Sequence, residues 1–495
     1  MGAEKRPSGH LAKLRAHLAR SAKLLRSQLA SRRAVCPNSS RKPSSDEPPN
    51  LPDSVTQVTE ISHLGRELVV KRAVIRHLRP ARPVSSEVPA AAIVPVSRPQ
   101  VSSDGSAPSH PPPCEGEPTV HRWGEDFTGT RTIMKHIGID IGTKTIVVAY
   151  PGADGKTNFL SEINGYWQFE RATPFVENML NDPKKKRSDG TERPARWLKV
   201  PESNRLIVLG RDAEEFAFAK NDTLQRPMAE GGISPDEDAM TVLSAIVHGL
   251  LNMAENDVGK FGSDVKICYC TTAPAINKDS SIDYHQRVVN LILDNYESPA
   301  TKAVSNIKES HAIVINMNSD GTGIGISWGA GTVTVSYIKY GMEIYSFCWV
   351  GAGDWIDTQV AMRHGYDPEL FKTRKKMAKE TPTTVSRRKM DIDLTPGHEP
   401  EDRLGMDIVL HYDVLISNVI AGIAQGFEAH ESQARIEEGV NVYMAGGTSS
   451  PKGFVQRVAK KLDEATLPFS IGEVKRSSQP LYCVAEGLLK AAEMF

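Results

Sequence analysis

The chain has 495 residues, enough for about two or three domains, and its 60 basic residues balance its 60 acidic ones. This balance excludes a protein that behaves as a polyelectrolyte over its whole surface. No stretch approaches the roughly 18 consecutive apolar residues of a membrane span. The six cysteines form no CxxC pair and have no histidine partners at zinc spacing. A reduced, intracellular chain is therefore the simplest interpretation.

Residues 1–133 form a basic leader rich in proline and serine. We expect it to be disordered, because it offers too little apolar surface to offset the entropy of ordering. One exception is a set of leucines at helical spacing among lysines and arginines, which predicts an amphipathic helix over residues 9–30. Such a helix could lie on an anionic membrane or touch nucleic acid. The alternative is an accidental leader, with Met134 as the true start.

The stretch MKHIGIDIGTKTIVVAY, Met134 to Tyr150, predicts two strands joined by a tight Gly-Thr turn. Asp140 lies where the first strand ends, and the turn that follows contains Gly142, Thr143 and Lys144. Such a turn offers backbone N–H groups and a hydroxyl to phosphate oxygens, while the carboxylate can hold a hydrated Mg²⁺. On this stretch alone, an ordinary β-hairpin remains the alternative.

The next segments alternate between strands and helices. A strand at residues 205–209 precedes RPMAEGGIS, and a long apolar-periodic helix opens at Asp236. A buried strand at residues 265–270, a proline-containing turn and a helix follow, in the order that is typical of α/β proteins. Residues 304–308 predict another short strand, and residues 309–317 a short helix.

A second hairpin, GIGISWGAGTVTVSYIKY at residues 323–340, repeats the first one. Its glycine turn contains Gly329, Gly331 and Thr332. Two such hairpins predict an internal duplication in which each half contributes one phosphate loop. After them, VGAGDWID places Asp354 and Asp357 near the start of a helix, where a carboxylate either caps the helix or contacts a ligand.

The last part of the chain predicts a long helix over residues 404–429, then a strand, a Gly446-Gly447 turn and two further helices. Five motifs, in this order, resemble the actin/Hsp70/sugar-kinase superfamily, and most closely the bacterial actin-like proteins of the MreB and MamK type. They are GIDIGTKT, RPMAEGGIS, SWGAGTVTV, VGAGDWID and VYMAGGTSSPKGF. The ending PLYCVAEGLLKA is also similar to that of MreB.

The resemblance implies an α/β, two-lobed actin-like fold, a duplicated ribonuclease-H-like ATPase with the nucleotide cleft between its lobes. Residues 134–310 would form lobe I. Residues 311–495 would form lobe II, with the adenosine loop and a closing C-terminal helix. The implied cofactors are ATP or ADP and Mg²⁺.

Residue by residue, the resemblance implies four groups of contacts to the nucleotide. Asp140 would be the metal ligand, and the turn after it would face the phosphates, with the second hairpin opposite. The connecting segment and the adenosine loop would complete the site. The implied residues are Asp140, Gly142, Thr143, Lys144, Gly329, Gly331, Thr332, Gly351, Gly353, Asp354, Asp357, Gly446, Gly447 and Thr448.

Departures from the family pattern bear on hydrolysis. Ser327 stands where the second phosphate loop normally begins with an aspartate, and the ribose-contacting glutamate has no counterpart in the basic stretch TRKKMAK. The residue that orients the attacking water would lie on the helix after the proline turn, where at most one of Asp283, His285 and Gln286 fills the role. We therefore expect weak or absent ATP hydrolysis.

The predicted function is that of an ATP-binding cytoskeletal protein of the cytoplasm that assembles head to tail with itself. Its basic segments could contact a membrane surface, and we expect no sequence-specific nucleic-acid binding. The alternative is a non-polymerising Hsp70/actin-fold scaffold that binds ATP, or a degenerate ATPase. An Hsp70 chaperone is disfavoured because no β-rich peptide-binding domain follows, and a sugar kinase because no motif for an acceptor hydroxyl is present.

Overall fold

The computed structural model describes residues 134–494 except 188–189, 201–202, 221, 279–281, 297–302, 371–379, 431–433 and 435–438. The predictions for residues 1–133, including the amphipathic helix over residues 9–30, lie outside the described residues. So does the stretch TRKKMAK.

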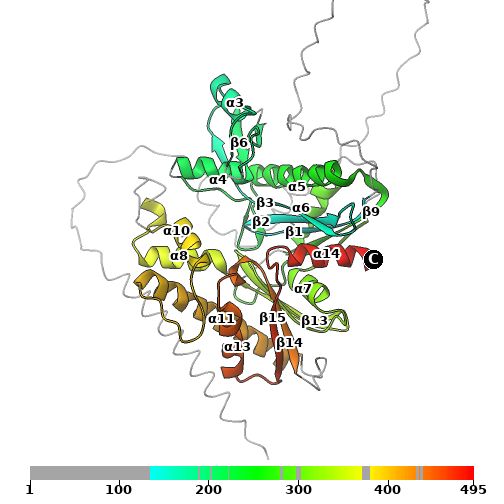
Figure 1. Cartoon of the computed structure of the whole chain (residues 1–495), viewed down its shortest axis with the longest axis vertical. Helices are drawn as coiled ribbons and strands as arrows, with labels where there is room; N and C mark the ends of the chain where they lie inside the picture. Colours follow the sequence, from blue (N-terminus) through cyan, green and yellow to red (C-terminus); the bar gives the residue numbers. More distant parts are fainter. Residues whose placement is uncertain are drawn as a thin grey trace, which may run out of the picture. The chain divides into compact units, whose positions relative to one another are not determined.

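The first lobe is built on a mixed five-stranded sheet with strand order β10-β9-β1-β2-β3 (Figure 1). Strand β2 (Thr145–Pro151) runs antiparallel to both of its neighbours, β1 (Met134–Ile141) and β3 (Thr157–Ile163). On the other side of β1, strands β9 (Phe261–Thr271) and β10 (Ala303–Lys308) extend the sheet and run parallel to β1. The alternating isoleucines of β1 are fully buried, as expected for the central strand of a sheet that is covered on both faces.

The second lobe repeats this sheet. Strands β11 (Gly323–Trp328), β12 (Thr332–Lys339) and β13 (Met342–Val350) form the antiparallel part, and β14 (Val440–Ala445) and β15 (Ile471–Arg476) continue in parallel. From its parallel end, the second sheet has the order β15-β14-β11-β12-β13, which matches the order β10-β9-β1-β2-β3 of the first sheet strand for strand. The predicted duplication, and with it the two-lobed actin-like fold, is confirmed by this topology.

Helices on the outer faces complete two hydrophobic cores. In the first lobe, α5 (Glu237–Val258) and α6 (Ile282–Asp294) contribute to the core, and Asp236 caps α5 by accepting from the backbone N–H of Asp238. In the second lobe, α8 (Gly353–Arg363), α11 (Arg403–Ala429) and α13 (Phe454–Glu464) do the same. By length and composition α11 could cross a membrane, although the sequence predicted no membrane span. Most of its apolar stretch is buried in this core.

Two helices lie between the sheets, and the C-terminal one packs on the lobe to which it does not connect directly. Helix α7 (Glu309–Met317) packs on β11, whereas the C-terminal helix α14 (Cys483–Met494) packs on β1. Glycines permit both contacts, because a Cβ on Gly138 or on Gly325 would overlap the backbone carbonyl of the helix. The closing helix, which we placed with lobe II along the chain, therefore packs on the sheet of lobe I. The boundary at residues 310 and 311 stays a prediction.

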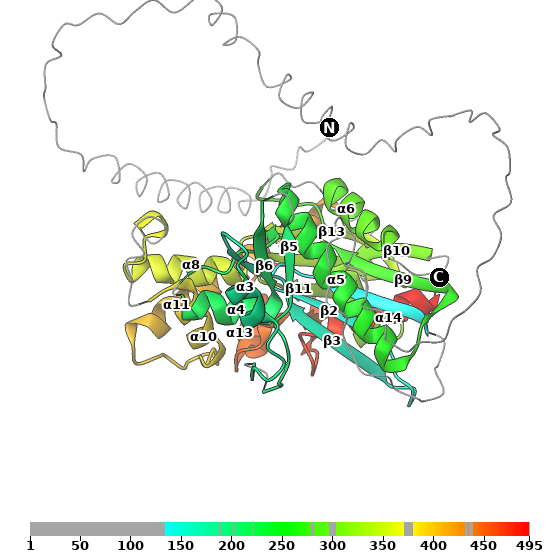
Figure 2. The ribbon, with the colours of Figure 1, turned by 90° about the horizontal axis from the view of Figure 1, so that it is seen from above.

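Each lobe carries a smaller inserted part near the cleft. In the first lobe it contains α3 (Pro174–Leu180), α4 (Gly210–Ala219) and a small sheet made of β4 (Tyr166–Phe169), β6 (Arg205–Leu209) and β5 (Trp197–Val200). The short hairpin of β7 (Met228–Ala229) and β8 (Gly232–Ile233) follows it. In the second lobe, α10 (Pro382–Met390) packs on α8, and Figure 1 and Figure 2 both place α10 near α4.

Candidate functional site

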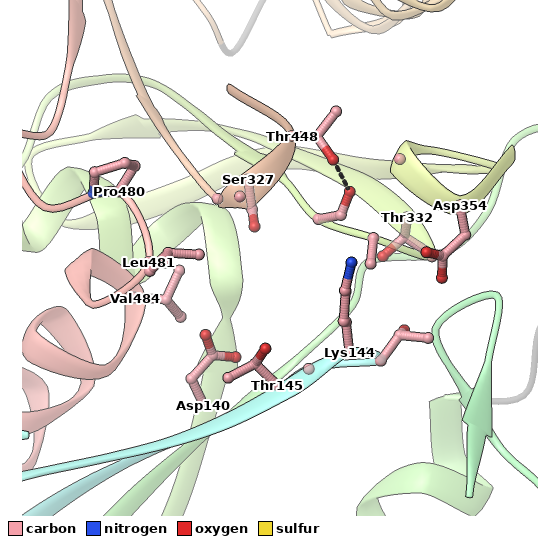
Figure 3. A pocket seen from close by; sticks show the side chains of 18 of the residues that line it. Asp140, Lys144, Thr145, Ser327, Thr332, Asp354, Thr448, Pro480, Leu481 and Val484 are labelled. Atoms are coloured by element: carbon pink, nitrogen blue, oxygen red, sulfur yellow. Dashed lines mark hydrogen bonds between the residues drawn. The ribbon is translucent and has the colours of Figure 1, made fainter. Parts of the chain in front are cut away.

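A cavity of about 360 Å³ lies where the two lobes meet, and its walls come from both of them (Figure 3). The β1–β2 and β11–β12 turns, the start of α8, helix α10 and the loop after β14 all line it. Thirteen of the fourteen predicted binding residues lie on its wall. The fourteenth, Gly351, stands behind them, with a φ of +93° and its N–H donating to the carbonyl of Gly331 at 2.9 Å.

The two glycine turns have the same geometry. The N–H of Gly142 donates to the carbonyl of Thr145 at 3.2 Å, and that of Gly329 to the carbonyl of Thr332 at 3.0 Å. In both turns a Cβ on the glycine would lie 2.8 Å from that acceptor oxygen, so a larger residue would open the turn. The lobes thus present two equivalent turns to one cavity.

Two carboxylates that interact with each other lie in the cavity, and the sequence predicted only one of them, that of the partly buried Asp140. The other belongs to Glu309, the first residue of α7. Burial raises the pKa of Asp140 to about 6, although a hydrogen bond donated by the Cys270 thiol (Sγ to Oδ1, 3.1 Å) opposes the rise. Burial and the nearby charge of Asp140 raise the pKa of Glu309 to about 8. Each carboxylate is thus costly to ionise without a cation beside it.

This pair fits a hydrated magnesium ion. Among the described residues no cluster of three or more His, Cys, Asp or Glu side chains forms a protein-only metal cage. Magnesium is usually held by one or two carboxylates together with waters and phosphate oxygens, which is what Asp140 and Glu309 beside two phosphate-type turns could provide. Ser327 lies in the same wall and brings no charge, so Glu309 supplies the second carboxylate.

The predicted aspartates of the connecting segment do not cap α8, because its N-cap residue is Ala352 and no side chain bonds to the helix end. Asp357 instead pairs with buried Lys389, whose Nζ lies 2.6 Å from Oδ1 and donates to the carbonyl of Gly353 at 2.8 Å. Burial raises the pKa of Asp357 and lowers that of Lys389, and their mutual attraction opposes both shifts. Asp354 pairs with Arg226 at 2.5 Å.

The loop after β14 is held against the second glycine turn. Thr448 donates from Oγ1 to the carbonyl of Gly329 at 2.7 Å, and Gly446 has a φ of +94°. The Thr448–Gly329 bond is drawn in Figure 3. Figure 3 also shows an apolar wall near Asp140, made by Leu481 and Val484 before and at the start of α14. The motif that holds Gly446 predicted the loop, but no sequence signal indicated the apolar wall.

The three candidate catalytic residues do not reach the cavity. Asp283 is exposed in the first turn of α6, Gln286 donates from Nε2 to Asn306 Oδ1 at 3.2 Å, and His285 is buried. None of them lines the cavity wall, because α6 packs against β8 and the outer side of β9. The catalytic role of one of these three residues stays a prediction, and Glu309 is the acidic residue of the cavity wall that the sequence pattern did not identify.

A positional signal could have identified Glu309. Parallel strands bring their carboxyl ends to one edge of a sheet, where ligand-binding residues of α/β proteins gather. Asp140 stands at the end of β1, and Glu309 directly follows β10, which is parallel to β9 and hence to β1. A search for acidic residues at the carboxyl ends of the predicted strands would have identified both Asp140 and Glu309.

Comparison with known proteins gives one family and several structures. Residues 134–492 match the family described as Volactin. No curated protein matches the chain. The chain is similar to the MamK double helical filament (17% identity, TM-score 0.49, 72% of this chain and 98% of that one). It is also similar to MreB5 of Spiroplasma citri bound to ADP (15%, 0.45, 71% and 94%).

A further similar structure is the ethanolamine utilization protein EutJ from Carboxydothermus hydrogenoformans (14% identity, TM-score 0.39, 72% of this chain and 89% of that one). The identities to these solved structures are low, whereas the family match extends over both lobes, from β1 into α14. The chain belongs to the Volactin family.

Proposed function

We propose that this protein binds ATP or ADP with Mg²⁺ in the cavity between its lobes. The observation that carries the proposal is the pair of equivalent glycine turns, which face one cavity that also holds the carboxylates of Asp140 and Glu309. In this proposal the N–H groups of both turns, the hydroxyl of Thr143 and the ammonium of Lys144 bind the phosphates. The loop at Gly446 and Gly447 packs against the adenosine.

Asp140 and Glu309 are the groups that would hold the hydrated magnesium ion. When bound, magnesium neutralises charge on the phosphate oxygens. The protein's own contribution is to place two carboxylates at one point and to surround them with buried residues such as Ile141 and Ser327. Since Glu309 compensates for the uncharged Ser327, a slow ATPase is favoured over a scaffold that has lost all metal ligands.

The test of binding is the affinity for ATP in Mg²⁺, measured by titration calorimetry on the full chain. Asp140→Ala should abolish Mg²⁺-dependent binding, because one of the two carboxylates is lost. The matched control is Asp463→Ala, an exposed aspartate on α13 far from the cavity wall, which should bind as the wild type does. Unchanged affinity in Asp140→Ala would overturn the proposed site.

We further propose that the protein is cytoplasmic and assembles head to tail, with membrane contact through its basic segments. The support is the sequence resemblance, carried by the RPM segment and the C-terminal ending. Sedimentation of the full chain with ATP, with ADP and without nucleotide tests this proposal, and phosphate release in the same samples measures hydrolysis. A protein that binds ATP but never sediments would instead be the non-polymerising scaffold.

A further inference from the structure

Helix α11 buries one side in the second lobe and leaves the opposite side uncovered by any described residue. On that side Met406, Leu410 and Val414 expose 49, 47 and 41% of their surface, although they lie in the middle of an ordered helix. The exposed line continues through the small residues Ser417 and Ala421 and then through Gln425. Three large apolar side chains in a row on one helix face are a feature of contact surfaces rather than of solvated ones.

The exposed line has charged ends of opposite sign. Arg403 begins it and Glu428 ends it, and within the described part of the chain neither forms an ion pair. The spacings between successive exposed positions follow the same order whether they are counted from Arg403 or from Glu428. The midpoint of the line therefore lies between Val414 and Ser417. The spacings average about 3.6 residues, so the line runs nearly straight along the helix.

We propose that this face is the contact of a two-fold dimer, in which α11 packs antiparallel against α11 of a second copy. Antiparallel pairing about the centre of the line sets Leu410 opposite Ala421 of the other copy and Val414 opposite Ser417. Leu410 and Val414 then each meet a small side chain, which allows close packing, and Met406 meets Gln425. Arg403 of each copy meets Glu428 of the other, so both ends of the contact are electrostatically complementary.

The charges favour a second copy over other occupants. A parallel pair would set Arg403 against Arg403 and Glu428 against Glu428, which is repulsive. A helix that lies on an anionic membrane carries lysines and arginines beside its apolar face, whereas this line ends in one charge of each sign. The contact is isologous and closes at two subunits, so it differs from head-to-tail assembly. It does not involve the cavity and stands whether or not the chain binds ATP.

The first test is the oligomeric state of the full chain, measured by sedimentation velocity over a dilution series. Nucleotide is left out and EDTA is added, so that any nucleotide-driven assembly does not contribute. The wild type should dimerise, and Leu410→Glu, which sets two charges into the apolar contact, should raise the dissociation constant at least about tenfold. The matched control is Met342→Glu, an apolar residue on β13 that is 64% exposed and should leave the dimer unchanged.

Circular dichroism of each variant separates loss of the contact from loss of the fold. A wild type that stays monomeric throughout, or a folded Leu410→Glu variant that dimerises as tightly, would overturn the proposal. So would binding of the wild type to phosphatidylglycerol vesicles through this face without dimerisation.

A second test determines the orientation by disulfide cross-linking. In a chain whose Cys36 and Cys114 are changed to serine, the remaining four cysteines are buried. The variants Leu410→Cys and Ala421→Cys should cross-link to each other when mixed, while neither cross-links efficiently to itself. Self-linking of either variant, without the mixed product, would indicate a parallel contact and contradict the pairing.

The charge pair gives an independent check that needs no cysteine. Arg403→Glu or Glu428→Arg alone should weaken the dimer about three- to tenfold, because each creates two repulsive contacts at the exposed ends. The double variant should restore the wild-type dissociation constant. Additive weakening in the double variant would show that the two residues do not meet across the contact.

Discussion

Glu309 and Asp140 bring two acidic groups to one cavity wall, and Glu309 lies there because it directly follows β10. Its carboxylate accepts a hydrogen bond from Thr334 Oγ1 at 3.5 Å. The raised pKa of Glu309 reflects first its burial and then the repulsion between its carboxylate and that of Asp140 when both are ionised. Glu309 is therefore suited to bind a cation or a water, and its ionised carboxylate does not stabilise the fold when no cation is bound.

Glu309→Gln tests this role. In EDTA at pH 8 the variant should melt at a higher temperature than the wild type, because a buried charge is removed. The rise in melting temperature on adding Mg²⁺ and ATP should shrink, and phosphate release should fall by at least about tenfold. Differential scanning fluorimetry and a phosphate assay measure these effects.

The control for that experiment is Glu214→Gln, an exposed position on α4. It should leave both the melting temperature and phosphate release unchanged. Equal Mg²⁺ stabilisation in Glu309→Gln and the wild type would remove Glu309 from the site.

At this scale the sequence predicted the turn residues well and the charged residues poorly. Gly142 and Gly329 were predictable because a tight turn between two strands leaves a local signature. Lys389 was not, because its burial depends on α10 folding back onto α8, a tertiary contact that no local pattern encodes. That His285 does not line the cavity was not predictable for the same reason, since the packing of α6 decides which way its side chains point.

Several side-chain contacts among the described residues join the two lobes, and we call three of them the cleft clasp. Lys144 of the first turn donates to Ser386 of α10 at 3.1 Å, and Arg226, from the RPM segment before β7, pairs with Asp354 of α8. The guanidinium of Arg387 on α10 lies 5.0 Å from the ring centre of Phe218 on α4. The RPM motif was visible in the sequence, but that its arginine crosses the cleft was not.

Loss of one clasp contact should speed nucleotide release. Arg226→Ala breaks the partly exposed ion pair with Asp354 without changing a residue that lines the cavity, so the dissociation rate of a fluorescent ATP analogue should rise about two- to fivefold. Stopped-flow displacement measures this rate. Lys199→Ala, which breaks the Lys199–Glu177 pair within the first lobe, is the control and should not change it. A rate that is equal in Arg226→Ala and the wild type would show that the clasp does not limit release.

The molecule as a whole carries buried charge that links its stability to pH. The folded-state pKa of Glu309 is about 8, above its ordinary value of 4.5, so the folded protein holds a proton that the unfolded chain releases. Stability is therefore lost as pH rises towards 8. His285 works in the opposite direction, since burial lowers its pKa to about 4 and stability is lost as pH falls below its ordinary value of 6.5.

Above the ordinary pKa of His285 the change at Glu309 dominates, so we expect stability to fall as the pH rises above 6.5 when cations are absent. Between pH 6.5 and 8 in EDTA, the free energy of unfolding from urea titrations should fall by on the order of 2 kcal/mol. Mg²⁺ should reduce this fall, and Glu309→Gln should flatten it. A wild type that is equally stable at both pH values would contradict a raised pKa at Glu309.

The duplication was the part of the whole-molecule fold that the sequence predicted best, because the two hairpins repeat each other along the chain. The packing of α14 on the first lobe was not predictable, since this helix reads simply as the last element of the second lobe. The close approach at Gly138 is what allows the helix to reach that sheet.

The packing of α14 on the first lobe has a consequence for how the protein is made. Strand β1 is among the first described residues to leave the ribosome, yet the helix that covers it, α14, begins about 350 residues later. The first lobe stays open on one side until the C-terminal segment has been synthesised, and contacts so distant along the chain form slowly. The two lobes are thus completed together, and a protease or chaperone that acts during synthesis would encounter the uncovered face of β1.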